Sequence, residues 1–148
     1  MKRKKIVVTG LGALSPNGNS VTEFWENCIN GISGINQITR YNTDDHRVSI
    51  AGELSDFKPE NTLKSKIIRK LDPFSVYALV TASEAIEMSG LNTDNINLDK
   101  VGVTIGTGIG GIQTLESQHT LINEKGSKRV SPQFVPKMIA NIAGGHIA

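Results

Sequence analysis

The feature that most constrains this 148-residue sequence is an uncharged helix with a clear beginning and end. Asp72 is a good N-cap, and Pro73 suits the first helical position. Gly90 stands where a terminating glycine belongs, so a helix is predicted over residues 73–89. Its first nine residues carry no charge, and we expect this front part to be buried on nearly all sides. The fold must therefore place neighbours on both sides of this helix.

Two β-branched runs, each followed by glycines, predict buried strands. Residues 5–9 read Lys-Ile-Val-Val-Thr, and residues 101–105 read Val-Gly-Val-Thr-Ile. A helix from Ile112 to about Asn123 is predicted after the second run. Because strands alternate with well-bounded helices, the sequence indicates an α/β fold with a sheet covered by helices on both faces.

A second amphipathic helix is predicted directly after Ser20. This serine and Glu23 form a capping box, apolar residues recur at helical spacing as far as Ile29, and Gly31 provides the stop. Cys28 lies on the apolar stripe of this helix. We therefore expect it to be a buried structural cysteine, since a reactive thiol needs exposure and an electropositive neighbour.

The remaining segments are less regular. Residues 33–62 are predicted to be irregular, with one short edge strand over residues 48–51. A short helix is predicted over residues 62–71. Ser131 and Pro132 open a further helical segment whose apolar residues continue to Ile142. The chain then stops in an apolar element without a polar tail, so we expect a truncated, incomplete domain over residues 1–148.

Composition excludes several classes of function. One cysteine and three scattered histidines offer no metal-ligand spacing, so no metal site is expected. A net charge of +2 is too small to imply a nucleic-acid partner. No run approaches the roughly 18 apolar residues of a membrane span, and the basic start lacks the apolar core of an export signal. A cytoplasmic protein that neither spans nor binds a membrane is therefore expected.

The glycine-rich segment after the second predicted strand raises an alternative function. Gly106, Gly108 and Gly111 match the spacing of a dinucleotide-binding fingerprint, which would indicate a nicotinamide-dependent oxidoreductase. Such a site also needs an acidic residue after the next strand, about 20 residues on, to bind the ribose. That region is instead a basic loop, residues 124–129. A close-packed turn without a cofactor is the favoured interpretation.

Basic residues gather on one side of the helix predicted over residues 62–71. They are Lys66, Arg69 and Lys70, and Lys128 and Arg129 could add a second group. From the residues alone, this is either an ordinary solvated helix face or a surface for an acidic partner.

Several motifs, taken in order, resemble one family. They are Val7-Val-Thr-Gly-Leu-Gly, Ser15-Pro-x-Gly18, the Phe24-Trp25 helix, Gly31-x-Ser-Gly-Ile, Gly106-x-Gly-Ile-Gly-Gly and Ser131-Pro-x-Phe-Val-Pro136. The chain resembles the β-ketoacyl-acyl-carrier-protein synthases from residue 3 to its last residue, most of all the type II elongating enzymes of fatty-acid synthesis. This resemblance implies a thiolase-like fold, with most of the first of two α/β halves present here, and a homodimer.

The resemblance also implies an activity that these residues alone would lack. In the family a cysteine nucleophile follows this segment, and two histidines and a lysine come from the second half, so no catalytic residue is expected here. Cys28 does not match the nucleophile. The implied reaction condenses an acyl thioester with malonyl-carrier protein, without cofactor or metal. A chain-length partner or ketosynthase of a polyketide pathway is a further alternative.

Two kinds of site residue follow from the resemblance. Ile109 corresponds to a residue lining the acyl-chain pocket, and Phe134 to an aromatic near that pocket and the dimer contact. The basic residues match positions that receive acidic acyl carrier protein: Lys66, Arg69 and Lys70, with Lys128 and Arg129 as a second patch.

Overall fold

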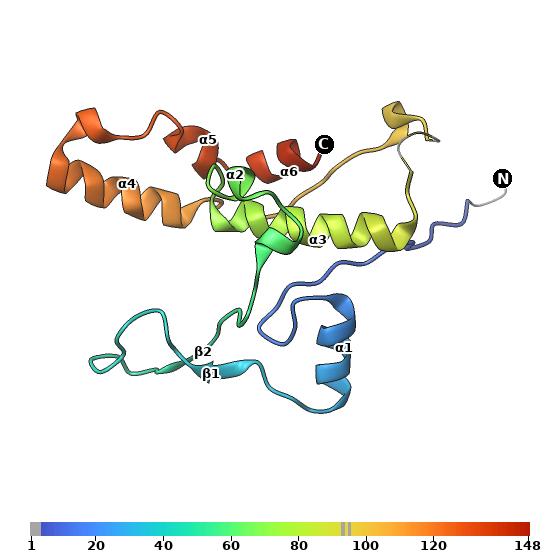
Figure 1. Ribbon diagram of the computed structural model, residues 1–148, viewed down its shortest axis with the longest axis horizontal. Helices are drawn as coiled ribbons and strands as arrows, with labels where there is room; N and C mark the ends of the chain where they lie inside the picture. Colours follow the sequence, from blue (N-terminus) through green and yellow to red (C-terminus); the bar gives the residue numbers. More distant parts are fainter. Residues whose placement is uncertain (1–3, 93, 95) are drawn as a thin grey trace. The chain divides into compact units, whose positions relative to one another are not determined.

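The computed structural model describes residues 4–92, 94 and 96–148, which form two compact units. The first unit comprises the residues up to Lys58 together with Ser83–Leu91. The second comprises Pro59–Ala82 and Asn92–Ala148. The long helix α3 (Pro73–Ser89) contributes its front part to the second unit and its last residues to the first (Figure 1).

The first unit contains the predicted capped helix and a small hairpin. Helix α1 (Val21–Ile29) begins at Ser20, whose hydroxyl accepts a hydrogen bond from the Glu23 amide. The Glu23 carboxylate accepts one from the Asn19 amide at 2.7 Å, and Gly31 adopts a φ of +67° after the helix ends. The sequence prediction for this helix is confirmed. The capping serine and the terminating glycine each bind or shape the backbone only a few residues away, so their effect can be read from the sequence.

Strands β1 (Ile35–Gln37) and β2 (Ile50–Gly52) pair antiparallel in the first unit, with Asn36 opposite Ala51. The second strand overlaps the predicted edge strand over residues 48–51. The first strand was not predicted, because residues 33–62 carry no strong alternation.

The second unit is helical in the part that the structure describes. It contains the front of α3, one further long helix, and several short helices and 3₁₀ turns. In chain order the elements are η1 (Pro59–Asn61), α2 (Ser65–Ile68), the front of α3, η2 (Leu98–Lys100), α4 (Ile112–Lys125), η3 (Ser127–Arg129), α5 (Phe134–Met138) and α6 (Ile142–Ile147).

The predicted bounds of helix α3 are confirmed, but burial of its front on nearly all sides is not, because only Ser75 and Val76 are buried. It spans the predicted residues, Asp72 precedes it and Gly90 follows with a φ of +64°. Ser75 and Val76 are buried, and the other residues of its front half are at most partly exposed. Late in the helix, Ile86 and Met88 are exposed.

The two predicted central strands are wrong for the described residues. Residues 5–9 and 101–105 form no strand, and Ile6, Val8 and Val101 have exposed fractions of 96%, 79% and 46%. A strand exists only through hydrogen bonds to a neighbouring strand, and neither run pairs with another strand among the described residues. The Val101 amide donates only to the Leu98 carbonyl of the preceding turn. The β-branched residues favour a strand, but no neighbouring strand is present to pair with them among the described residues.

Two predicted helices are shorter or divided. The helix over residues 62–71 is reduced to the four residues of α2. The segment after Pro132 is divided into α5 and α6, with an extended backbone at Ile139. The division has a physical reason, because the Met138 carbonyl accepts a hydrogen bond from the Gly111 amide rather than continuing the helical pattern.

Candidate functional site: the glycine-rich turn and its neighbours

Residues 106–111, called here the glycine-rich turn, are closely packed at their end. Gly110 has a φ of +78° and donates its amide hydrogen bond to the Thr107 hydroxyl at 3.1 Å. Gly111 donates to the Met138 carbonyl at 2.9 Å. A Cβ atom at Gly110 would lie 2.6 Å from that carbonyl oxygen, and one at Gly111 would lie 2.5 Å from the Lys137 carbonyl oxygen. Glycine is therefore required at both positions by close backbone approach.

Asp72 holds the start of the helix that follows this turn. Its Oδ2 accepts hydrogen bonds from the Thr114 amide at 2.8 Å and from the Thr114 hydroxyl at 2.7 Å. Its Oδ1 accepts from the Phe74 amide at 3.2 Å, which caps α3. Asp72 is only 2% exposed. One buried carboxylate thus caps the N-termini of two helices, where its negative charge is stabilised by both helix dipoles.

This geometry does not favour a dinucleotide at the turn. A pyrophosphate would need the free amides at the N-terminus of α4, but the Thr114 amide is bound to the Asp72 carboxylate and the Ile112 amide to the Gly110 carbonyl. Gly106 and Gly108 have open space around their Cα atoms, and the tight contacts are at Gly110 and Gly111. The turn serves packing within the chain.

An apolar pocket of about 270 Å³ lies beside the turn. Ile109, which is 64% exposed, stands at this pocket. The pocket is lined by Ile109, Gly111, Ile112, Leu115, Met138, Ile139 and Ala140. Phe134 is partly exposed on α5, one turn before Met138, and is not among the lining residues. The structure therefore brings Ile109 to an apolar pocket and does not bring Phe134 into it.

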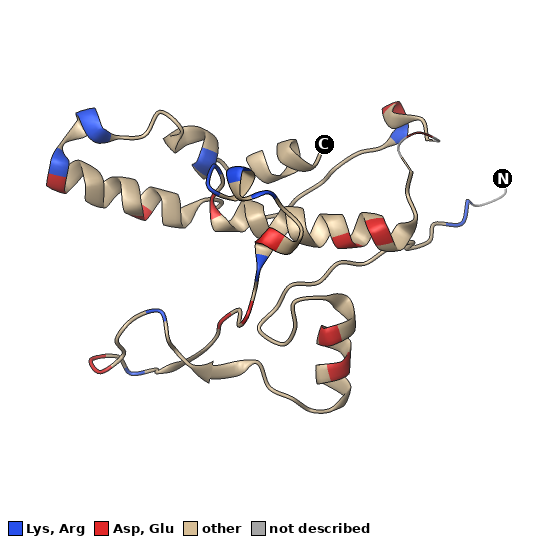
Figure 2. Cartoon of the chain, viewed as in Figure 1, with Lys and Arg blue, Asp and Glu red and all other residues tan. Residues whose placement is uncertain are grey.

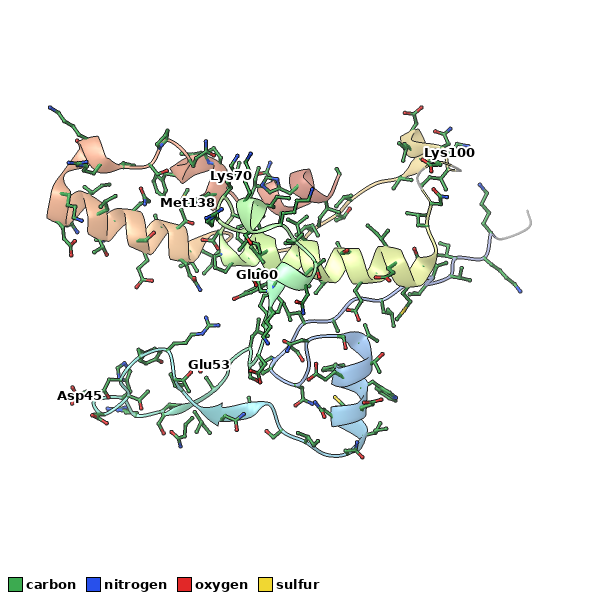
Figure 3. All side chains as sticks on the ribbon, in the orientation of Figure 1. Asp45, Glu53, Glu60, Lys70, Lys100 and Met138 are labelled. Carbon is green, nitrogen blue, oxygen red and sulfur yellow. The ribbon has the colours of Figure 1, made fainter. Side chains whose placement is uncertain are left out.

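The predicted basic residues are all exposed and lie in two groups. Lys66 belongs to α2, and Arg69 and Lys70 follow it directly (Lys70 is labelled in Figure 3). Lys128 and Arg129 belong to η3. Figure 2 shows the two groups as separate blue regions. None of these five side chains forms an ion pair with another described residue, so their charges are available to a partner.

Sequence reasoning missed one basic residue next to the first group. The Lys137 ammonium of α5 donates a hydrogen bond to the Arg69 carbonyl at 3.0 Å. The two residues are 68 positions apart, and a single lysine in an apolar segment carries no signal of such a contact. Only the tertiary structure places the charge of Lys137 at the Arg69 backbone.

The expectation that Cys28 is buried is wrong. Cys28 is exposed, and its sulfur accepts a hydrogen bond from the Asn17 side chain at 3.5 Å. The apolar stripe of α1 is uncovered within the described chain, and Trp25 and Ile29 are 63% and 64% exposed. A helical stripe buries a residue only where another element covers it.

Two further observations concern membranes and metals. No helix among residues 4–92, 94 and 96–148 is long and apolar enough to cross a bilayer. Within the same residues, no three histidine, cysteine, aspartate or glutamate side chains gather as metal ligands would.

The backbone of the chain resembles that of solved ketosynthases, so its fold class is thiolase-like. A type II polyketide synthase acyl-carrier protein in complex with its ketosynthase, bound to the hexaketide, matches with a TM-score of 0.79 and 29% identity, over 98% of this chain and 38% of that chain. The ishigamide ketosynthase/chain length factor matches with a TM-score of 0.78 and 25% identity, over 96% of this chain and 36% of that chain. A β-ketoacyl synthase from Burkholderia phymatum STM815 shows the same fold at 0.75 and 19% identity, over 95% and 35%.

Sequence similarity then identifies the family. Residues 3–148 match the β-ketoacyl synthase, N-terminal domain, and the chain belongs to this family. The 3-oxoacyl-[acyl-carrier-protein] synthase 2 of Staphylococcus aureus (strain N315) is 44% identical over 147 residues, 99% of this chain and 36% of that protein. The protein of the same name from Synechocystis sp. is 40% identical over 145 residues, which are 98% of this chain and 35% of that protein. The chain thus spans about a third of the length of these relatives. The predicted family and the thiolase-like fold class are confirmed.

Proposed function

We propose that the full-length protein is a 3-oxoacyl-[acyl-carrier-protein] synthase that elongates acyl chains in fatty-acid synthesis. The observation that carries this proposal is the 44% identity over 147 residues to a protein of that name. The role of this chain in the reaction is to line part of the acyl pocket and to receive the carrier protein. The cysteine and histidines that perform the chemistry are placed outside residues 1–148, so these residues alone would be inactive.

The proposed reaction has two half-reactions. An acyl group passes from the carrier-protein thiol to an enzyme cysteine thiolate, and the carrier thiol leaves with a proton. Malonyl-carrier protein then loses carbon dioxide, and the resulting carbanion attacks the acyl thioester, which releases the cysteine. The product is a 3-oxoacyl-carrier protein two carbons longer. Decarboxylation drives the condensation, so no cofactor or metal is required.

The apolar pocket supports a role in holding the acyl chain. Its volume of about 270 Å³ lies just below the range of roughly 300–1,000 Å³ for ligand pockets. Its lining is almost wholly aliphatic, and each buried methylene of a substrate would contribute about 0.8 kcal/mol. We propose that Ile109 limits chain length sterically. Phe134 is proposed to act from the dimer contact, because it is not a lining residue of this pocket.

The basic residues support docking of an acidic carrier protein. Lys66, Arg69 and Lys70 are exposed and unpaired among the described residues, and a solved relative is a ketosynthase in complex with an acyl-carrier protein. Positive charge in this arrangement would steer a negatively charged partner during encounter. Lys128 and Arg129 would form a second contact. A cytoplasmic homodimer completes the proposal, with the exposed apolar side chains of α1 covered in the complete protein.

The activity test uses purified full-length protein with acyl-carrier protein and malonyl-carrier protein. Equal amounts of carbon dioxide and 3-oxoacyl-carrier protein support the proposal. Carbon dioxide without condensation product, or no reaction with any acyl chain, would overturn it.

The docking test is the charge reversal Arg69→Glu in the full-length protein. We expect affinity for the carrier protein to fall about tenfold at low salt, with a weaker dependence on salt, because one attractive charge becomes repulsive. Arg47→Glu is the matched control, since Arg47 is also exposed and lies outside both basic groups. Equal losses in the two variants would count against the docking surface.

A polyketide ketosynthase or its chain-length partner is the second candidate. It is favoured by the two solved relatives with TM-scores of 0.79 and 0.78, which are a type II polyketide ketosynthase and a ketosynthase/chain length factor. Product analysis separates the candidates. One elongation per loading event with saturated acyl chains indicates fatty-acid synthesis, whereas repeated elongation to poly-oxo chains indicates the polyketide role.

A further inference from the structure

Asp72 is a buried charged residue to which the proposed reaction assigns no role. It is 2% exposed and lies immediately after Leu71 and the basic residues Arg69 and Lys70. A carboxylate buried to this degree is stable only if its oxygens are well bonded. Both oxygens of Asp72 are, through three hydrogen bonds to Phe74 and Thr114.

The bonds to Thr114 restrain the wall of the apolar pocket. Thr114 belongs to the first turn of α4, between the lining residues Ile112 and Leu115. Gly111, also a lining residue, is so close that a Cβ atom there would lie 3.1 Å from the Asp72 Oδ2. The turn that carries Ile109 is therefore held on one side by Met138 and on the other by Asp72.

The position requires a carboxylate rather than an amide. All three groups that approach Asp72 are donors, namely two backbone amides and one hydroxyl. An ionised aspartate accepts at both oxygens, whereas an asparagine would turn an NH₂ group toward a donor at one of the two ends. The charge also strengthens each hydrogen bond.

We propose that Asp72, acting through Thr114, is a positioning residue for acyl-chain selection. It holds α4 and the glycine-rich turn so that Ile109 keeps one place at the apolar pocket. Loss of this anchor lets the turn relax and weakens the steric limit on chain length. The inference rests on the proposed function, since it takes the apolar pocket as the acyl site.

The test compares Thr114→Val with Thr114→Ser in the full-length protein. Valine keeps the shape and the backbone amide but removes the hydroxyl that binds Asp72, whereas serine retains that hydroxyl. The measured quantity is the ratio of kcat/KM for dodecanoyl-carrier protein to that for butyryl-carrier protein. We expect the ratio to change about fivefold in Thr114→Val, as for loss of one hydrogen bond, and to stay at the wild-type value in Thr114→Ser. Asp72→Asn should change it in the same direction.

Two results would overturn the inference. One is an unchanged ratio in Thr114→Val and Asp72→Asn, even if both variants unfold at lower temperature, because a purely structural cap would lower stability alone. The other is an equal change in Thr114→Ser. Amide hydrogen exchange of the glycine-rich turn gives a readout independent of activity, and we expect faster exchange in Thr114→Val and Asp72→Asn but not in Thr114→Ser. If the wild type makes no 3-oxoacyl product, the proposed function fails, while unchanged exchange in the variants refutes the anchor itself.

Discussion

In each of the two units, a carboxylate of α3 or its N-cap accepts hydrogen bonds from the N-terminus of another helix, but the two carboxylates differ in burial. In the second unit, the Asp72 carboxylate at the start of α3 binds the first turn of α4. In the first unit, the Glu84 carboxylate near the end of α3 accepts hydrogen bonds from the amides of Val21, the first residue of α1, and Ala13, each at 2.8 Å. Each carboxylate therefore satisfies an amide at the N-terminus of another helix. The difference is exposure, because Asp72 is buried and Glu84 is partly exposed.

This difference shows why burial, and not the number of hydrogen bonds, sets the importance of such an anchor. Phe74 and Thr114, like Ala13 and Val21, are partly exposed, but Asp72 is 2% exposed whereas Glu84 is partly exposed. If the carboxylate is removed, we therefore expect water to replace it more readily at Glu84 than at Asp72. An unsatisfied buried donor carries its full desolvation cost, whereas an exposed one does not.

The largest expected effect is on the free energy of unfolding when the Asp72 or the Glu84 carboxylate is removed. We expect Asp72→Ala to lower the free energy of unfolding of the full-length protein by about 3 kcal/mol, and Glu84→Ala by about 1 kcal/mol. Urea unfolding followed by circular dichroism measures both. Asp72→Asn and Glu84→Gln keep the side-chain shape and remove the charge, and we expect the larger loss again at position 72. Equal losses at the two positions would remove the distinction drawn from burial.

The close packing beside Asp72 gives the next effect. Gly111→Ala places a Cβ atom against the Lys137 carbonyl, and we expect a loss of about 2 kcal/mol from overpacking. Gly108→Ala meets open space and should change stability by less than about 0.5 kcal/mol. A dinucleotide fingerprint would make both glycines necessary for nucleotide binding. Similar stability in the two variants would contradict the packing role of the turn.

The smallest effect concerns the partly exposed carboxylate of Glu53 in the first unit. The Thr39 hydroxyl, at 2.7 Å, and the Thr39 amide, at 2.9 Å, lower the pKa of Glu53 below its ordinary value of 4.5, with a smaller contribution from Arg40 (Figure 3 labels Glu53). The lowered pKa means that Glu53 contributes stability above about pH 4.5, and that this contribution is lost as pH falls through the folded-state pKa.

Thr39→Val tests this contribution because it removes the hydroxyl and keeps the amide. We expect the pKa of Glu53, followed by NMR during acid titration, to rise toward its ordinary value. Thr39→Ser should retain the wild-type titration. A pKa that is the same in Thr39→Val and the wild type would show that the side-chain bond has no effect.

The boundaries of α1 and α3 were predictable from the sequence, because their capping signals are local. Ser20, Pro73, Gly31 and Gly90 act on amides and carbonyls within a few residues, and the structure places helix ends where they predict. The resemblance of the motifs to the β-ketoacyl synthases was also sufficient to identify the family. The presence of Ile109 on a close-packed glycine turn followed from the same motifs.

What the sequence by itself determined about this protein is therefore its family, its capped helices and the tight turn. Only the tertiary structure decided the rest: that residues 5–9 and 101–105 lack strand partners among the described residues, that Cys28 is exposed, and that Lys137 and Thr114 meet residues 68 and 42 positions away. The physical reason is range. A cap or a turn is satisfied by its own neighbours, whereas a strand, a buried side chain or an anchored carboxylate depends on which distant residues come to satisfy it.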